Sequence, residues 1–155
     1  MNTNSKYSIA IISVFLWIGF VCAISFMEAW LKFSAPGVTI PIGLGIGRLV
    51  FGALNKIEWV FTVGIALNLI LTKTPLLTAR NVFYLVPVAL LVLQTFLLLP
   101  FLDIRAEQLI QGEELPSSNV HFYYVGMEVL KIICLFIFGI KILGLNGKFE
   151  TDRAD

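Results

Sequence analysis

One apolar run of the chain decides its fold class. Residues 81–102 read NVFYLVPVALLVLQTFLLLPFL and contain no charged side chain. A hydrocarbon core about 30 Å thick is crossed by a helix of roughly 20 apolar residues. The run therefore predicts a membrane-spanning helix. Pro87 lies inside it and removes one backbone donor, which membrane helices tolerate where neighbouring groups satisfy the freed carbonyl.

Three other stretches of the chain are also long and apolar. Residues 9–27 are uncharged, and the breakers Pro36, Gly37 and Pro41 separate them from the next stretch. A long polar loop is expected at 103–119. The predicted helices span residues 8–32, 42–72, 79–102 and 119–145.

The composition agrees with a membrane environment. The chain has 155 residues, of which 58% are hydrophobic and 14% charged, whereas an ordinary soluble domain has about 25% charged residues. We therefore expect an all-α polytopic membrane protein, a single domain over residues 1–155 folded as an antiparallel four-helix transmembrane bundle. The net charge of +1 gives no field that attracts nucleic acid. The expected partners are the lipid bilayer, a small solute or ion, and a second copy of the chain.

The first apolar run has an alternative interpretation as a cleaved signal peptide. Lys6 precedes it, and Ala23-Ile24-Ser25 resembles a cleavage site. Signal-peptide apolar regions are about 7 to 15 residues long, and this run is longer. We expect it to be retained as a span.

The distribution of basic residues predicts the orientation. An even number of spans places both termini on one side, and the positive-inside rule makes the more basic side cytoplasmic. The prediction is a multi-pass protein of the inner (plasma) membrane with both termini in the cytoplasm. The basic residues on that side are Lys6, Lys73, Arg80, Lys141, Lys148 and Arg153.

Polar and ionisable residues gather in the half of the bundle that faces away from the termini. On the last helix, His121, Tyr124, Glu128 and Lys131 follow spacings of three, four and three, so they share one face. A charge at the bilayer centre costs at least about 2.5 kcal/mol, so this face must look inward. The candidate pocket residues are Glu28, Arg48, Asn55, Glu58, Asp103, Arg105, His121, Tyr124, Glu128 and Lys131.

Several ion pairs are plausible within this set. Glu128 and Lys131 can interact at i,i+3, and Lys131 can also reach Glu58 on the second helix. Arg48 is expected to pair with Glu28 or Glu128, and either Arg48 or Arg105 to lie within reach of Glu128 or Asp103. His121 is expected at the outer mouth of the same pocket.

Two interpretations of these polar residues remain open. They can form an internal salt-bridge network that fixes helix register. Alternatively, they line a cavity open to the outer side, since an ionisable residue inside a membrane is a functional-site hypothesis by default.

Signatures of enzymes and metal sites are missing from the sequence. It contains no Gly-x-Ser-x-Gly, His-Glu-x-x-His or P-loop pattern, which favours a non-enzymatic role and leaves any cofactor unknown. His121 is the single histidine, too few for a typical zinc site, so no metal is expected. Cys22 and Cys134 lie in apolar runs and are expected to be small core residues. Gly43, Gly45 and Gly47 predict close helix packing.

Two segments carry a resemblance to known proteins. The first is FMEAWLKF at 26–33, followed by Ala35-Pro36 and by GIGR at 45–48; the second is LDIRA at 102–106, followed by His121, Glu128 and Lys131. They resemble a group of small bacterial four-helix membrane proteins of unknown function. More distantly, they resemble a superfamily that includes a vertebrate transmembrane protein associated with cisplatin resistance. The resemblance implies the four-helix fold and a link to tolerance of solutes or metal drugs.

Three functions follow as hypotheses. The first is an outer-facing polar pocket within the membrane that binds or conducts a small solute, ion or proton. The second is a quinone- or lipid-binding membrane enzyme or redox accessory, in which buried carboxylates serve as acid or base. The third is a non-catalytic partner subunit of a membrane complex.

Overall fold

The computed structural model describes residues 6–76, 81–116 and 118–154, with side chains up to residue 146. This part of the chain is all-helical, as predicted, and forms four long helical segments. π-Helical turns interrupt the first and third segments (η1 and η4). In chain order the elements are α1 (Ser8–Val21), η1 (Cys22–Glu28), α2 (Ala29–Leu31), η2 (Lys32–Ser34), α3 (Ile40–Leu71), α4 (Val82–Leu93), η4 (Gln94–Leu98), α5 (Leu99–Ile110) and α6 (Val120–Ala154).

The helices are long enough to cross a membrane. Within the described residues, Ser8–Ser34, Ile40–Leu71 and Val82–Ile110 are both long and apolar enough to do so. The predicted fourth span, 119–145, lies within the 35-residue α6 except for its first residue. At about 1.5 Å per residue each of these segments exceeds a hydrocarbon core of about 30 Å.

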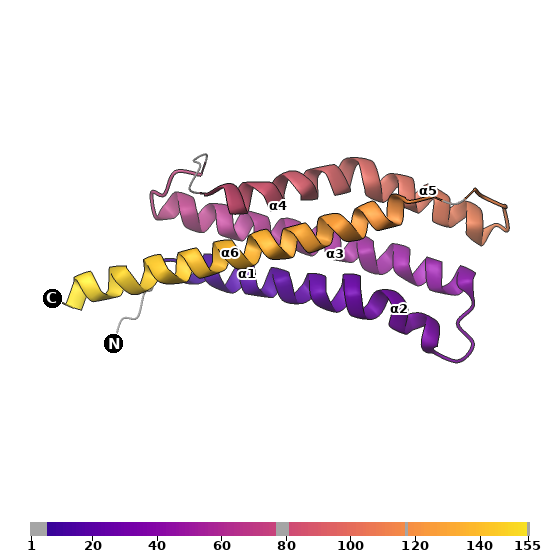
Figure 1. Cartoon of the computed structure of the whole chain (residues 1–155), viewed down its shortest axis with the longest axis horizontal. Coiled ribbons are helices and arrows are strands. Elements are labelled where there is room, and N and C mark those ends of the chain that lie inside the picture. The colour runs from indigo at the N-terminus through magenta and orange to yellow at the C-terminus, as the bar shows by residue number, and fades with distance from the viewer. Residues whose placement is uncertain (1–5, 77–80, 117, 155) are drawn as a thin grey trace.

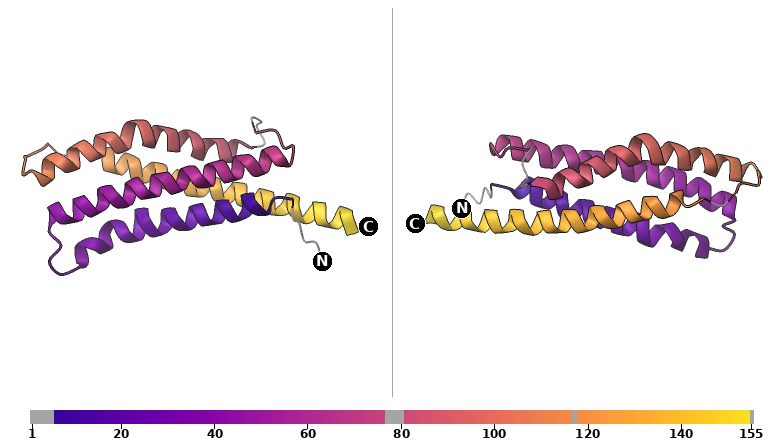
Figure 2. Two further views of the ribbon diagram at one scale, coloured as in Figure 1. Left: turned by 180° about the vertical axis from the view of Figure 1, so that it is seen from behind. Right: turned by 45° about the horizontal axis from the view of Figure 1, so that its top comes forward.

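The four segments lie alongside one another (Figure 1). Contacts join α1 to α3 and α6, and α4 and α5 complete the arrangement by packing on α6 and α3 respectively. The start of α1, the end of α3 and the end of α6 lie at one end of the molecule, and both views of Figure 2 agree on this. We call the opposite end, formed by η2, the start of α3, α5 and the start of α6, the pocket end.

Two predicted loops are shorter than expected because the helices beside them are longer than predicted. The helix predicted to start at 42 starts at Ile40, with Pro41 in its first turn, where a missing backbone donor costs nothing. The loop predicted at 103–119 was wrong at its start. Pro100 occupies the first turn of α5 directly after a π-helical turn, and the helix continues to Ile110. Gly112 then ends this segment with a φ of 86°, a conformation that favours glycine.

The remaining boundaries also differ, and the largest difference, nine residues, is at the end of the last helix. The first segment continues to Ser34 instead of ending at 32. The predicted start of the third helix at 79 lies outside the described residues, and α4 begins at Val82. The last helix passes its predicted end at 145 and continues to Ala154, because Gly144 and Asn146 each cost a helix at most about 1 kcal/mol relative to alanine.

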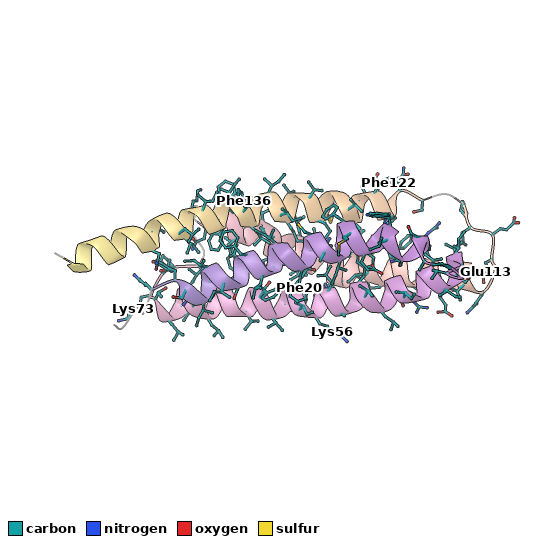
Figure 3. The ribbon with its side chains drawn as sticks, turned by 90° about the horizontal axis from the view of Figure 1, so that it is seen from below. Phe20, Lys56, Lys73, Glu113, Phe122 and Phe136 are labelled. Atoms are coloured by element: carbon teal, nitrogen blue, oxygen red, sulfur yellow. The ribbon has the colours of Figure 1, made fainter. Side chains whose placement is uncertain are left out.

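Apolar side chains occupy the inside and the outside of the helices. Trp17, Leu54 and Leu135 are fully buried at the centre of one core. Many large apolar residues point outward, among them Phe20, Phe122 and Phe136 in Figure 3. A helix that is apolar all round is typical of a membrane span or of the interior of a large protein.

Only some of the cysteines and glycines that were expected to be buried or closely packed are so in the structure. Cys134 is buried as expected, but Cys22 is exposed, so its assignment to the core was wrong. Gly43 packs against the Phe33 ring and Gly47 against the Lys32 ammonium group, whereas nothing lies within 4 Å of a Cβ built on Gly45. Close packing therefore uses two of the three glycines.

The contact between α1 and α6 predicts a specific effect on stability. A Cβ on Gly139 would lie 3.1 Å from both Val14 and Phe15, and Val14 is fully buried. Gly139→Leu should lower the free energy of unfolding in detergent by about 1–3 kcal/mol, as overpacking typically does. The same change at Gly144, where nothing lies within 4 Å, is the control and should have little effect. Equal losses in the two variants would contradict the packing described for α1 and α6.

Candidate functional site

A cavity of about 650 Å³ opens at the pocket end. Its walls are mostly apolar and come from α2, η2, α3, η4, α5 and the start of α6. We call it the pocket. Its lining consists of Ala29, Lys32, Phe33, Gly43, Leu44, Gly47, Arg48, Phe51, Gly52, Thr95, Leu99, Pro100, Leu102, Asp103, Ala106, His121 and Tyr124.

Ion pairs hold the charged groups that line the pocket. The Arg48 guanidinium donates to both carboxylate oxygens of Asp103, at 2.5 and 3.0 Å, and also to Glu107. Lys32 lies 3.3 Å from Glu28, one helical turn earlier. The expected reach of Arg48 to Asp103 is confirmed, but its expected pairing with Glu28 or Glu128 was wrong. Asp103 and Glu107 are one turn apart on α5, so a single guanidinium on α3 can hold both.

Aromatic rings extend the wall around Lys32. Its ammonium nitrogen lies 5.6 Å from the centroid of the Phe33 ring and 5.5 Å from that of Phe51, which is within cation–π range. Phe51 in turn meets the Tyr124 ring edge-on, with centroids 5.5 Å apart. The pocket therefore combines aromatic surface with cations that already have carboxylate partners.

A second group of charges lies deeper in the molecule, and we call it the buried cluster. Glu58 on α3 and Glu128 and Lys131 on α6 are all fully buried. The Lys131 ammonium donates a hydrogen bond to Glu58 Oε1 and lies 3.1 Å from Glu128 Oε1. The predicted inward orientation of Glu128 and Lys131 and the predicted Lys131–Glu58 pair are confirmed.

Two neutral side chains complete the buried cluster. Trp17 Nε1 on α1 donates to Glu58 Oε1 at 2.8 Å, and Gln94 Nε2 on η4 donates to Glu128 Oε1 at 3.0 Å. Each of the four helical segments thus supplies at least one side chain. Neither donor was predicted from the sequence. Gln94 could have been, because it is a polar amide in an otherwise apolar run.

The π-helical turn at η4 serves both the pocket and the cluster. Gln94 begins the turn and faces Glu128, while the next residue, Thr95, lines the pocket. Thr95 Oγ1 accepts hydrogen bonds from Asn55 at 2.9 Å and from Trp59 at 3.1 Å. Asn55 therefore supports the pocket wall from behind. A π-helical turn shifts the helix face by one residue and is frequent at functional sites.

Tyr124 lies where the pocket and the buried cluster meet. It lines the pocket, is 2% exposed, and precedes Glu128 by one helical turn on the same face. His121, one turn earlier, lines the pocket and is exposed. Arg105 donates a hydrogen bond to the Pro116 carbonyl at 2.7 Å and so links α5 to the loop that follows it. It belongs neither to the pocket nor to the buried cluster.

The structure places most of the predicted site residues either at the pocket or in the buried cluster. Glu28, Arg48, Asp103, His121 and Tyr124 belong to the pocket or to its ion pairs, whereas Glu58, Glu128 and Lys131 form the cluster. Among the residues that the structure describes, no three or more His, Cys, Asp or Glu side chains are grouped closely enough to hold a metal ion.

The lysine of the buried cluster should contribute most to stability. Lys131→Met removes the ammonium but keeps an apolar side chain of similar length, and it leaves two buried carboxylates without their cation. Such an uncompensated charge typically costs about 3–5 kcal/mol. Glu58→Gln and Glu128→Gln should each cost less, because one ion pair survives.

Equilibrium unfolding of the purified protein in mixed detergent micelles measures these losses. Lys56→Met, at an exposed position of α3, is the matched control and should be nearly neutral. Combining Lys131→Met with Glu58→Gln should recover part of the loss instead of adding to it. Strictly additive losses would show that the two side chains do not interact.

Comparison of the chain with known protein families, with curated proteins and with solved structures found no match.

Proposed function

We propose that the chain is an antiparallel bundle of four membrane-spanning helices, and that its pocket binds a small amphipathic solute. In this proposal the protein lies in the inner (plasma) membrane with both termini in the cytoplasm, and the pocket end faces the opposite side. The observation that carries the proposal is the 650 Å³ pocket with apolar walls and paired charges.

The distribution of polarity supports the membrane part of the proposal. Large apolar side chains cover the outside, with Leu49 78% exposed and Val60 and Phe96 each 67% exposed. Fully buried charges occupy the inside. A soluble protein rarely exposes so much contiguous apolar surface, whereas lipid requires it and excludes charge.

The chemistry of the pocket supports a solute with an apolar body. Binding cavities for small molecules are commonly about 300–1,000 Å³, mostly apolar, with a few placed polar groups. Here Phe33, Phe51 and Leu99 offer apolar contact, while Arg48 and His121 offer hydrogen-bond donors. A salt-bridge network that only fixed helix register would require no cavity, so the pocket favours binding over a purely structural role.

The proposed orientation can be measured with reporter fusions. Alkaline phosphatase is active only where its disulfides form, on the non-cytoplasmic side. Fused after residue 155 it should be inactive, and inserted at Gly112, in the turn after α5, it should be active. A green fluorescent reporter should give the reverse pattern. An active phosphatase at the C-terminus would contradict the proposed topology.

Filling the pocket should weaken solute binding. A Cβ on Gly52 meets nothing within 4 Å and Gly52 lines the pocket, so Gly52→Leu places a side chain into the cavity without a clash. Binding of dansylaminoundecanoic acid, a fluorescent amphiphile, should weaken about tenfold, which corresponds to ~1.4 kcal/mol. The readout is fluorescence titration of the purified protein.

Gly45→Leu is the matched control for this experiment. Gly45 lies on the same helix, has nothing within 4 Å of an added Cβ, and is outside the pocket lining. Its affinity for the probe should equal that of the unmodified protein. If the two variants bind the probe equally well, the amphiphile does not bind in the pocket.

A further inference from the structure

The buried cluster contains more negative than positive groups. Two carboxylates, Glu58 and Glu128, face a single ammonium, Lys131, and all three side chains have no exposed surface. The elements packed around them contribute Trp17 from α1 and Gln94 from η4, which carry no charge. With every group in its ordinary ionised form the cluster has one uncompensated negative charge, which a protein interior strongly disfavours.

The cluster also has oxygen atoms without hydrogen-bond partners. The residues concerned are at most 2% exposed and come from three of the four helical segments. Two further titratable side chains of α6 lie one turn from the pair: Tyr124 precedes Glu128 by four residues, and the buried thiol of Cys134 follows Lys131 by three. The unpartnered atoms are Glu58 Oε2, Glu128 Oε2, Gln94 Oε1 and the Tyr124 hydroxyl oxygen.

We propose that the buried cluster is a binding site for one small monovalent cation, either a proton or Na⁺. One such ion balances the charge of the two carboxylates and the ammonium. A proton forms an O–H bond with one carboxylate oxygen and returns to water on release. Na⁺ is a hard cation, and carboxylate, amide and hydroxyl oxygens are the ligand types that such ions prefer.

This ion site is distinct from the solute pocket. The ion binds to Glu58 and Glu128, neither of which lines the pocket. Tyr124 adjoins both, so its hydroxyl lies on the boundary between solute and ion. The ion site goes beyond the proposed solute binding, and an experiment without any amphiphile tests it separately.

Thermal unfolding of the purified full-length chain in detergent tests the proposal. The midpoint is measured against Na⁺ concentration at fixed pH, with choline as the replacement cation, and against pH without Na⁺. An ion that binds only the folded state raises the midpoint as its concentration rises. A Na⁺ site predicts the first response, and a proton site predicts stabilisation as pH falls.

Two glutamate variants locate the response. Glu128→Gln keeps the size of the side chain but leaves Glu58 and Lys131 as a neutral pair, so the response to the ion should be lost. Glu58→Gln should have the same effect, because it leaves Glu128 and Lys131 as a neutral pair. Glu113→Gln makes the same chemical change in the loop after α5 and should leave the response intact (Figure 3).

Infrared spectroscopy of the unsubstituted protein supplies a measurement that does not depend on a variant folding. A proton site predicts that the C=O band of a buried protonated carboxyl group grows as pH falls, and that the band is absent from Glu128→Gln and Glu58→Gln. Stability and spectrum that respond neither to Na⁺ nor to pH would overturn the proposal. A response that persists equally in Glu128→Gln and Glu113→Gln would do so as well.

Discussion

The hydrogen-bonded ion pair between Lys131 and Glu58 joins α6 to α3, and both side chains are fully buried. Trp17 ties α1 to the same carboxylate, and Gln94 ties the third segment to Glu128 beside it. Sliding one helix by a turn would break several of these bonds together. It would also leave a buried charge without its partner, which is strongly destabilising. The relative positions of all four helical segments therefore depend on one network, in which two carboxylates share a single ammonium group.

The pocket adjoins this network at Tyr124, which lines the pocket and lies one helical turn from Glu128. The π-helical turn η4 places Gln94 toward the cluster and Thr95 toward the pocket, and Asn55 and Trp59 fix Thr95 in place. Gly52 on α3 leaves open the space that a larger side chain would occupy. Arg48 on α3 forms ion pairs with Asp103 and Glu107 and so links α3 to α5. Packing and charge pairing together hold a cavity open instead of letting it collapse.

Sequence patterns predicted the features that follow from local spacing. The three, four and three spacing on the last helix predicted the inward orientation of Glu128 and Lys131, because helix geometry and the cost of charge in lipid both require it. The similar depths of the charged residues also predicted the Lys131–Glu58 pair. Nothing in the sequence marked Trp17 as a further partner of Glu58, because that contact depends on tertiary placement. Pro41 was misinterpreted as a helix breaker, since a proline in a first turn reads the same in sequence as a proline that stops a helix. The polar residues from Asp103 onward were misinterpreted as a loop, although α5 continues to Ile110.

The pairing of Arg48 has a consequence for selectivity. Three of its five N–H donors bond two carboxylates, so an arriving head group finds two remaining donors but no uncompensated positive charge. Discrimination among solutes then depends on how well the apolar body fits between Phe33, Phe51 and Leu99, at about 0.8 kcal/mol for each buried methylene. A pocket of this kind ranks its ligands by length and shape and tolerates a range of head groups.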